Sequence, residues 1–551
     1  MVLNNLQKEL QKVIEGEVVS DEVSLKKYSR DASLFEVTPQ IIVFPKNRKD
    51  VQSVINFVNN NRHQYKNLSI TGRAAGTDMT GGPINEGIIL DFTKYFKKES
   101  VNLSRMTAIV EPGVFYRDFE LDTLPKQVSM PVYPASKSLA ALGGMIMNNC
   151  GGEKSLRFGQ MRNFVNEIKM VLANGNEYVF RKLSMSELEK KMEQTDFEGE
   201  IYKRMFELVS KNYDLIKNSK PKVAKNSSGY ALWDIYNKEE GTFDLSQLFV
   251  GSQGTLGIMS EAEVRLVETN ENERLVVMFF DSWSDLPSVV NDILPFRPDS
   301  METFDDTTLK LGLRFMPEIA KKVGKNLFSF IIDFIPEFFI GIRMMGLPKL
   351  IVLIEIAEKT SEEADKKVAD ISRMLHSKNI IYRVAKDKAD AEKYWIMRRE
   401  SFSLLREKVK DKKTAPFIED FCIDEKKMPE FLPKLISILK EHKIVVNIAG
   451  HAGSGNLHII PLMDLSKKEE RDKILVVSDK VYSLIVEYGG SITAEHNDGI
   501  IRTPYVEQMF GKEMYNIFET VKDIFDPNNM FNPGKKVGGS KEYMDSHIIK
   551  G

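Results

Sequence analysis

Residues 71–82 read Thr-Gly-Arg-Ala-Ala-Gly-Thr-Asp-Met-Thr-Gly-Gly, a glycine-rich loop that directly follows an expected strand at residues 67–71. Glycine permits positive φ and lets the backbone approach a ligand closely. Successive backbone N–H groups in such a loop form a concave anion site, which suits a diphosphate. The loop lacks both the Gly-Lys-Ser/Thr of a Walker loop and the spacing Gly-x-Gly-x-x-Gly. On its own it is therefore equally compatible with a structural turn.

Two further glycine-rich segments follow the first along the chain. Residues 134–136 (Pro-Ala-Ser) precede Leu-Gly-Gly-Met-Ile-Met-Asn-Asn-Cys-Gly-Gly at residues 142–152, and Phe-Val-Gly-Ser-Gln-Gly-Thr-Leu-Gly-Ile-Met occupies residues 249–259. Between them, the turn dipeptide Asn174-Gly175 separates two apolar runs, which predicts a β-hairpin. Three glycine segments in one chain favour a ligand-binding surface over isolated turns.

The sequence around these segments indicates an α/β lobe followed by a second, α+β domain. Apolar runs at residues 41–44 and 88–92 predict strands, and the apolar spacing at residues 49–60 predicts a helix between them. Residues 182–222 are highly charged with helical periodicity, and we expect them to form a helical insertion. From about residue 270, strands alternate with long charged helices, which suits an antiparallel sheet.

In this order and spacing, the three segments resemble the FAD domain of the vanillyl-alcohol oxidase / p-cresol methylhydroxylase superfamily. Within it, the chain is most similar to the branch that holds D-lactate dehydrogenase, the D subunit of glycolate oxidase and D-2-hydroxyglutarate dehydrogenase. The resemblance runs from about Tyr28 to Lys535. It implies an α+β protein with a two-lobed p-cresol methylhydroxylase-type FAD-binding domain and an α+β substrate (cap) domain that contains an antiparallel sheet.

The resemblance also implies domain bounds and flavin contacts. The FAD-binding domain would span residues 1–269 with a core at 36–267, the cap 270–500, and a C-terminal segment that returns to the flavin 501–551. The implied FAD-binding residues are Gly72, Arg73, Ala75, Gly76, Thr77, Asp78, Gly81, Gly82, Pro134, Ser136, Gly143, Gly144, Asn148, Asn149, Gly152, Gly159, Gly257, Ile258 and Asn532.

The flavin is expected to be bound without a covalent tether. Some relatives attach it to a His or Cys, but none of the seven histidines lies in the first two glycine segments. Cys150 lies in the second, and we interpret it as a small packed residue, because free Cys commonly packs as a hydrophobe.

Two histidines flank a second glycine turn near the C-terminal end of the cap. Residues 450–458 read Gly-His-Ala-Gly-Ser-Gly-Asn-Leu-His between apolar runs that predict strands at 444–449 and 459–463. The glycines allow the chain to fold back, and paired cross-strand positions lie about 5 Å apart at Cβ, which suits two ligands of one metal. Residues 489–499 add a carboxylate and a third imidazole in Gly-Gly-Ser-Ile-Thr-Ala-Glu-His-Asn-Asp-Gly. Each motif alone favours satisfied histidines in a turn over a metal site.

Both motifs together match the family's substrate domain. By that resemblance, His451, His458 and Glu495 are ligands of a divalent metal, zinc or else manganese or iron, and His496 is the general base. The sequence departs from the family at Ser454, where Asp is usual, and at Asn497-Asp498, where Gly-Ile is frequent. Relatives fused to an iron–sulfur domain often carry Gly-Asp-Gly there, so the chain resembles their flavin half.

An arginine completes the expected site. Residues 395–400, Trp-Ile-Met-Arg-Arg-Glu, resemble the family's Trp-x-x-Arg-Glu, and Arg398 is expected to bind the substrate carboxylate through its bidentate fork. Arg399 is interpreted as an exposed helix charge, and the acidic pair Glu419-Asp420 receives no catalytic role. The implied reaction is FAD-dependent oxidation of a small (D-)2-hydroxy acid, such as lactate, glycolate or 2-hydroxyglutarate, to the 2-oxo acid, with hydride passing to flavin N5.

Two other functions fit part of this pattern. An FAD-dependent alkyl-transfer enzyme of the alkyl-dihydroxyacetonephosphate synthase type would need a run of adjacent histidines, which the sequence lacks. An electron-transfer flavoprotein subunit of a larger complex is the second alternative. Two cysteines cannot ligate an iron–sulfur cluster. Electrons would therefore leave to a separate acceptor: a quinone, another flavoprotein, an iron–sulfur subunit or oxygen.

Composition and one apolar segment bear on partners and location. The net charge of −2 does not indicate nucleic-acid binding, and no signal peptide is evident at the N-terminus, so a cytoplasmic location is expected. Residues 327–356 are rich in Phe, Ile, Leu and Met, but charged residues and prolines interrupt the run before it reaches membrane-spanning length. The pattern favours a helix buried in the cap and then a strand at 350–356. The alternative is a surface element at 327–349 that rests on the inner face of a membrane or on a partner.

Overall fold

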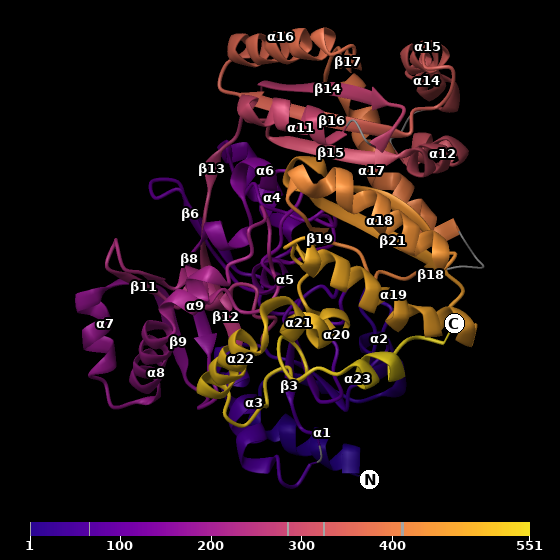
Figure 1. The fold of residues 1–551 in the computed structure, drawn as a ribbon. Helices are drawn as coiled ribbons and strands as arrows, with labels where there is room; N and C mark the ends of the chain where they lie inside the picture. The colour runs from indigo at the N-terminus through magenta and orange to yellow at the C-terminus, as the bar shows by residue number, and fades with distance from the viewer. Residues whose placement is uncertain are drawn as a thin grey trace.

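The computed structural model describes residues 2–65, 67–270, 272–283, 286–322, 326–408 and 413–550. Its N-terminal lobe is a four-stranded sheet covered by helices, at the bottom of Figure 1. The strand order is β1 (Glu17–Val19), β2 (Ile41–Phe44), β4 (Ile88–Asp91), β3 (Ile70–Arg73), and the helices are α1 (Val2–Val13), α2 (Glu22–Tyr28) and α3 (Arg48–Asn61). Strands β2, β4 and β3 are parallel, as alternating strands and helices predict.

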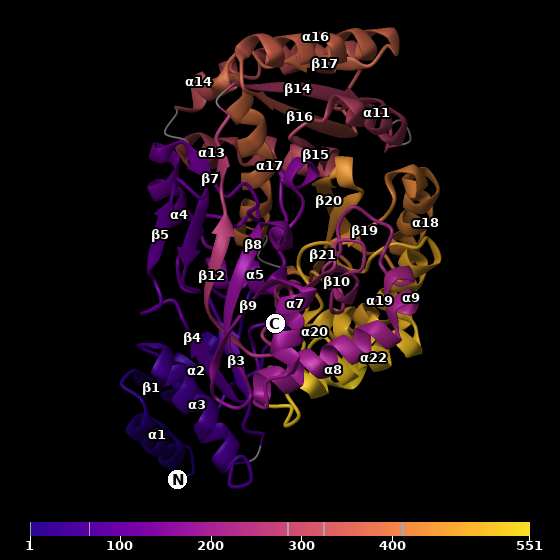
Figure 2. The ribbon, with the colours of Figure 1, turned by 90° about the vertical axis from the view of Figure 1, so that its left-hand side faces the viewer.

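The second lobe is a seven-stranded antiparallel sheet, whose strands are spread from left to right in Figure 2. Its order is β10 (Tyr236–Asn237), β11 (Thr242–Asp244), β9 (Glu177–Ser184), β8 (Val165–Val171), β12 (Ile258–Arg265), β6 (Thr107–Val110), β5 (Glu99–Asn102). The predicted hairpin is confirmed as β8–β9, with Gly175 at φ +78° in the turn. The second glycine segment forms α5 (Leu142–Asn148), whose buried Leu142, Met145 and Ile146 belong to the hydrophobic core of this lobe.

Helices predicted for residues 182–222 are present on the outside of this lobe. They are α7 (Met185–Met192), α8 (Phe197–Lys211) and α9 (Tyr213–Asn218). A capping box at Ser184 and Glu187 starts α7. Helix α8 buries an apolar stripe against the C-terminal helix α22 (Lys512–Phe525), and the two lie side by side in Figure 2. The insertion is therefore anchored to the lobe.

The cap is built on an antiparallel sheet, as expected. The order is β17 (Ile381–Val384), β14 (Asn272–Phe280), β16 (Leu350–Glu358), β15 (Ser300–Asp305), β20 (Val445–His451), β21 (Asn456–Met463), β18 (Lys413–Thr414), and β19 (Phe421–Cys422) also pairs with β21. The main helices that cover it are α11 (Leu286–Ile293), α12 (Asp306–Arg314), α16 (Ser361–Ser377), α17 (Lys388–Lys408), α18 (Met428–Glu441) and α19 (Lys468–Glu487).

The C-terminal part returns to the first lobe. Residues 499–525 form α20 (Gly499–Arg502), α21 (Val506–Phe510) and α22, and α23 (Lys541–Ser546) follows. Phe531, between α22 and α23, forms a parallel bridge with Ile70, so this stretch lies along β3, whose end carries the first glycine loop. The site is thus enclosed by segments from both ends of the chain.

The helix predicted to be buried at residues 327–349 is instead two short exposed helices, α14 (Leu327–Ile332) and α15 (Ile335–Arg343). They stand at the outer corner of the cap in Figure 1, and α15 has no buried residue. The prediction of burial is wrong, because a short apolar run does not by itself show whether a helix is buried or exposed. The strand that follows, β16, is present and buried.

Candidate active site

A cavity of about 910 Å³ lies between the glycine loops and the cap sheet. On one side it is lined by residues 72–79, 133–141 and 253–259 with their neighbours, and on the other by side chains of the cap. The cap contributes Thr308, Arg398, Arg399, Asn447, His451, His458, Glu495 and His496. The glycine motifs and the histidine motifs that the sequence singled out therefore face one space.

The first glycine loop is folded around the carboxylate of Asp78. That carboxylate accepts the backbone N–H groups of Gly82 (2.7 Å) and Thr80 (3.1 Å) and the side-chain amide of Asn148 (2.9 Å). Gly76 (φ +68°) has a conformation that disfavours other residues. Burial, followed by repulsion from Asp78, raises the pKa of the neighbouring Asp31 to about 7, so one of two adjacent acids is partly neutral near pH 7.

Two glycines in the cavity wall have room for a side chain that the protein does not fill. A Cβ on Gly72 would meet nothing closer than Ile258 Cδ1 at 3.7 Å, and one on Gly144 nothing closer than Ala74 Cβ at 3.6 Å. Neither has positive φ. Protein packing does not explain these glycines, whereas a flat ligand lying against the backbone would. The wall therefore fits the isoalloxazine and diphosphate of FAD.

Most of the predicted flavin residues line this cavity. They are Gly72, Arg73, Ala75, Gly76, Thr77, Asp78, Gly82, Pro134, Ser136, Gly143, Gly144, Asn148, Gly257 and Ile258. Gly81, Asn149, Gly152, Gly159 and Asn532 are not among the residues that line it. Buried Asn532 donates to the carbonyls of Gly82 (2.9 Å) and Gln253 (2.7 Å), so it joins the first and third glycine segments.

Cys150 lines the cavity but is suited to packing. Its thiol is buried, and burial raises its pKa well above the ordinary value. A protonated thiol is a poor nucleophile. The environment therefore agrees with a packed residue.

The second glycine turn brings the two histidines together, as predicted. Strands β20 and β21 pair antiparallel with Ala449 opposite His458, and Gly455 (φ +63°) lies in the turn. The rings of His451 and His458 are 5.2 Å apart at their centroids. The turn thus places two imidazoles on one side of the sheet.

Glu495 completes a set of donors that fits a divalent metal. Ligand atoms of His451, His458 and Glu495 all lie within 4.8 Å of one another. Nδ1 of His451 contacts a Glu302 oxygen at 2.6 Å, which leaves Nε2 directed to Glu495 at 3.5 Å. Metal-binding histidines characteristically have such a carboxylate on the second nitrogen. Burial and the neighbouring His451 and His496 lower the pKa of His458, which favours the neutral ring that a metal requires.

A buried lysine neutralises Glu495 in this structure. Lys225, 1% exposed, is ion-paired with the Glu495 carboxylate and lies 3.4 Å from Asn456 Oδ1. Burial alone would raise the pKa of Glu495, but Lys225 and His451 hold it well below the ordinary value. The carboxylate is therefore ionised, as a metal ligand must be.

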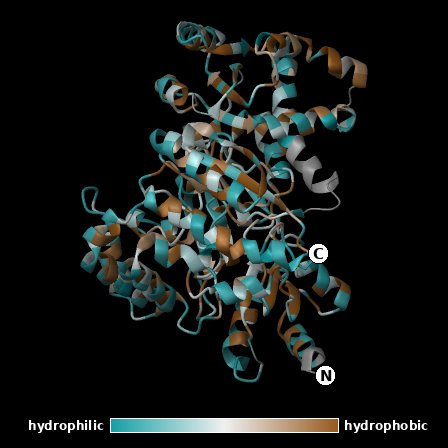
Figure 3. Cartoon of the chain, turned by 45° about the vertical axis from the view of Figure 1, so that its right-hand side comes forward, coloured by the Kyte–Doolittle hydropathy of each residue, from teal (hydrophilic) through white to brown (hydrophobic). Residues whose placement is uncertain are grey.

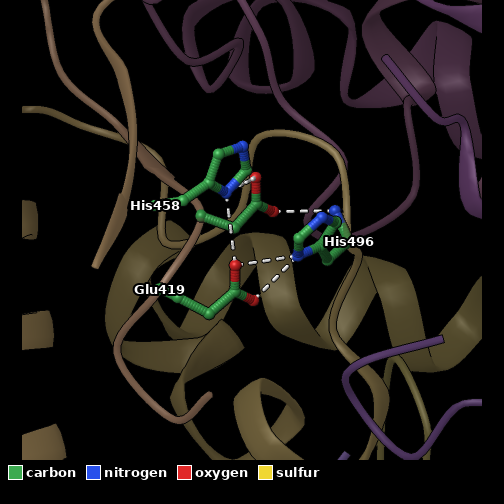
Figure 4. A group of neighbouring side chains, drawn as sticks. Glu419, His458 and His496 are labelled. Carbon is green, nitrogen blue, oxygen red and sulfur yellow. Dashed lines mark hydrogen bonds and ion pairs between the residues drawn. The ribbon is translucent and has the colours of Figure 1, made fainter. Parts of the chain in front are cut away.

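The Glu419 carboxylate lies between the rings of His458 and His496, as Figure 4 shows. It contacts Nδ1 of His496 at 2.8 Å and Nδ1 of His458 at 3.4 Å, and it accepts from buried Arg502 at 2.7 Å. Burial alone would lower the pKa of His496, but Glu419 and Asp420 raise it to about 10. The ring is thus held in place and favours the charged form. A divalent metal held by His451, His458 and Glu495 would place positive charge beside this ring and would therefore oppose its protonation.

Arg398 faces the cavity with its charge balanced by two acids. Its Nη atoms pair with Glu302 and, at 3.3 Å, with Glu153, while its buried Nε has no hydrogen-bond partner among the described residues. Arg399 is not an exposed charge, because it is half-buried and makes a bidentate pair with Glu153 at 2.9 and 2.6 Å.

Residues of the site that were not expected from the sequence include Glu153, Glu302, Glu419 and Lys225. Glu302 lies in a fully buried strand, and an acid within such a strand is a signal that could have been used. Glu419 was noticed but given no role. Lys225 ends a run of surface lysines, and nothing in its neighbours distinguishes it.

Comparison with known proteins agrees with this geometry. Residues 39–180 match the family description "FAD binding domain", and residues 269–536 match "FAD linked oxidases, C-terminal domain". The chain belongs to the FAD-linked oxidases. The solved structure of p-cresol methylhydroxylase with substrate bound has the same fold, with a TM-score of 0.66 at 14% identity over 98% of this chain and 97% of that one.

Two curated relatives are similar over nearly the whole chain. The D-2-hydroxyglutarate dehydrogenase of Haemophilus influenzae is 26% identical over 95% of this chain and 50% of its own length. The glycolate oxidase subunit GlcD of Bacillus subtilis is 26% identical over 92% of this chain and 91% of its own. The chain thus spans about half the length of the D-2-hydroxyglutarate dehydrogenases that it matches first.

Proposed function

We propose that this protein oxidises a small (D-)2-hydroxy acid, such as lactate, glycolate or 2-hydroxyglutarate, to the 2-oxo acid with non-covalently bound FAD. One observation carries the proposal: the glycine wall that fits a flavin and the His–Glu–Arg cluster line the same cavity. A hydroxy acid bound there would present its C2 hydrogen to the flavin and its polar groups to the cap. The names of the curated relatives support the same class of substrate.

The proposed roles follow from the positions of the side chains. Arg398, with its unpartnered Nε, binds the substrate carboxylate. His496 accepts the hydroxyl proton, and Glu419 stabilises the imidazolium that forms. Glu302 and Glu153 hold Arg398 in place. FAD, when bound, accepts the hydride at N5.

His451, His458 and Glu495 are proposed to hold a divalent metal, zinc or else manganese or iron. When bound, such an ion lowers the pKa of a coordinated hydroxyl. The proposal is supported by the clustering of two imidazoles and a carboxylate and by the Glu302 contact to His451. These ligands lie on the cap side of the cavity, and the Glu495 carboxylate also lies next to Gly151 of the second glycine segment.

In this proposal the chain consists of an FAD-binding domain at residues 1–269, a cap at 270–500 and a C-terminal segment at 501–551. The bound flavin passes electrons to a separate acceptor, a quinone, an electron-transfer flavoprotein or an iron–sulfur subunit. The location is cytoplasmic, and the proposal includes peripheral contact of the protein with the inner face of the membrane. None of the described helices has the length and apolar character needed to cross a bilayer.

Anaerobic mixing with a panel of hydroxy acids tests the proposal. The flavin absorbance of the purified holoprotein should bleach with at least one of D-lactate, glycolate and D-2-hydroxyglutarate, and less with the L-enantiomers of the chiral acids. The bleached enzyme should then reduce a dye acceptor. If no hydroxy acid bleaches the flavin, the electron-transfer subunit becomes the better interpretation and the proposal fails.

A second test addresses the flavin linkage. Because neither flavin loop supplies a His and the Cys150 thiol stays protonated, acid denaturation should release FAD intact into the supernatant. Flavin that remains on the denatured chain would contradict this and would identify Cys150 as the first candidate tether.

A further inference from the structure

Helices α14 and α15 carry a continuous set of exposed apolar side chains, here called the apolar patch. It consists of Leu327 (41% exposed), Phe328 (76%), Ile331 (48%), Ile332 (46%), Ile335 (48%), Phe338 (67%), Phe339 (64%), Ile342 (59%), Met345 (95%) and Leu347 (46%). Figure 3 shows these helices largely brown at the upper right of the cap. Monomeric soluble proteins seldom expose so many adjacent large apolar residues without a partner.

The helices of the apolar patch direct a charged side chain into the protein and large apolar side chains to the outside, opposite to the usual arrangement of a surface helix. On α15, Glu337 is turned into the protein, where its carboxylate accepts from Lys393 (3.0 Å), Arg383 (3.0 Å) and Tyr394. Lys393 also donates to the Asp333 carbonyl between the two helices. A surface helix normally buries its apolar face and exposes its charges. Here an ion-pair network, in which Lys393 is buried and Glu337 and Arg383 are partly buried, fixes the helices with the apolar face outward. The exposure is therefore a feature of the packed structure.

The charged side chains around the apolar patch indicate which kind of partner it contacts. The acid of α15 is turned inward, whereas Arg343 and Lys321 are exposed; Lys349 is also exposed and forms an ion pair with Asp306 at 3.0 Å. Apolar side chains surrounded by basic ones match a bilayer, where the apolar groups enter the acyl boundary and the long basic side chains reach the headgroups. Basic residues at this depth are attracted to anionic lipid.

We propose that α14 and α15 dock the protein on the surface of a membrane that contains anionic lipids. The helices are too short to cross it: α14 has 6 residues and α15 has 9. The contact is therefore interfacial. It does not depend on the proposed hydroxy-acid chemistry, but it favours a membrane-dissolved quinone among the proposed acceptors.

Co-sedimentation with vesicles tests the proposal on the full-length holoprotein. Wild type should sediment with phosphatidylcholine vesicles that contain phosphatidylglycerol, and less with pure phosphatidylcholine. Phe328→Ser/Phe338→Ser should lower the vesicle affinity at least tenfold, because each buried apolar side chain contributes about a factor of ten. Arg343→Glu should reduce the dependence on phosphatidylglycerol.

A matched control is available elsewhere on the surface. Val23 (81% exposed) and Leu121 (74%) are similarly exposed apolar residues outside the apolar patch, so Val23→Ser/Leu121→Ser should bind vesicles as wild type does. Both double variants should keep dye-linked turnover, since neither touches the cavity.

Absence of vesicle binding by wild type, or equal binding by the patch variant, would overturn the proposal. Gel filtration of the same samples identifies the alternative occupant. A wild-type dimer that the patch variant reduces to a monomer, without vesicle binding, would assign the patch to a second copy of the chain and would also overturn docking on lipid.

Discussion

The two walls of the cavity present different chemistry to its interior. The wall formed by residues 72–82 and 143–148 offers backbone and empty space, with its one loop carboxylate, Asp78, used to fold the loop. The wall formed by residues 451–458 and 495–496 offers ionisable side chains, each already in contact with an opposite charge or a second ring. The first wall therefore recognises a ligand by its shape and through backbone N–H groups, whereas the second acts through proton transfer and electrostatic interactions. Substitutions in the two walls should accordingly have separable effects.

The largest effect is expected in the glycine wall. Gly144→Val and Gly76→Val should both abolish FAD loading. In the first, the new side chain would fill the space kept for the ligand, and in the second a branched residue at φ +68° also strains the loop. Flavin absorbance per polypeptide, with circular dichroism to confirm folding, measures this.

Gly346→Val is a matched control, because a Cβ there meets nothing within 4 Å and the residue lies outside the cavity. It should bind flavin stoichiometrically. A folded Gly144→Val protein with full flavin content would show that this wall does not hold the cofactor.

The next largest effect is expected at the proposed metal ligands. His451→Ala or His458→Ala should lose the divalent ion and most turnover and keep FAD, because neither ring belongs to the glycine wall. Elemental analysis and flavin absorbance on the same samples decide it, with His442→Ala, outside the cavity, as the control. Stoichiometric metal and wild-type flavin reduction in His451→Ala would make the cluster structural and the proposed mechanism wrong.

A smaller effect on turnover is expected at His496. His496→Ala should keep both FAD and metal, while turnover falls by about 10²–10⁴, the usual contribution of a general base. Rapid-mixing rates of flavin reduction measure it. An unchanged rate would remove His496 from the reaction, and metal loss would show that it is a ligand instead.

The smallest effect on the reaction, and one specific to the charged wall, is expected at Lys225. Lys225→Met removes the ion pair of the buried Glu495 carboxylate and leaves it the contact with His451, which should cost about 3–5 kcal/mol of stability in the metal-free protein. Zinc supplies the missing positive charge, so it should raise the melting temperature more in this variant than in wild type. Thermal unfolding with chelator and with zinc gives both values.

Lys536→Met is the matched control, since Lys536 is also buried and paired with a carboxylate, Asp498, at 3.0 Å, but does not contact the donor set. It should destabilise the chain without enlarging the zinc-dependent increase. An equal increase in Lys225→Met and wild type would contradict the idea that lysine and metal share Glu495.

The sequence predicted the two walls unequally. The glycine loops and the turn from His451 to His458 were recognisable because each motif lies within a dozen residues. The contacts that tune the side chains join distant segments: Lys225 meets Glu495 across 270 positions, and Glu302 meets His451 across 149. No local pattern encodes such pairs. The apolar segment at residues 327–349 was recognised but was wrongly predicted to be buried, because an apolar composition does not show what a helix contacts.

The return of Asn532 to the glycine loops also has a consequence for biosynthesis. Its side-chain amide donates to the carbonyls of Gly82 and Gln253, and its side chain also contacts Thr71. The glycine loops are therefore joined by a residue that is translated 461 positions after that threonine. Because the N-terminal lobe leaves the ribosome first, it must wait with an unfinished binding surface. Stable capture of the flavin is therefore a late event, completed only when the C-terminal segment has emerged.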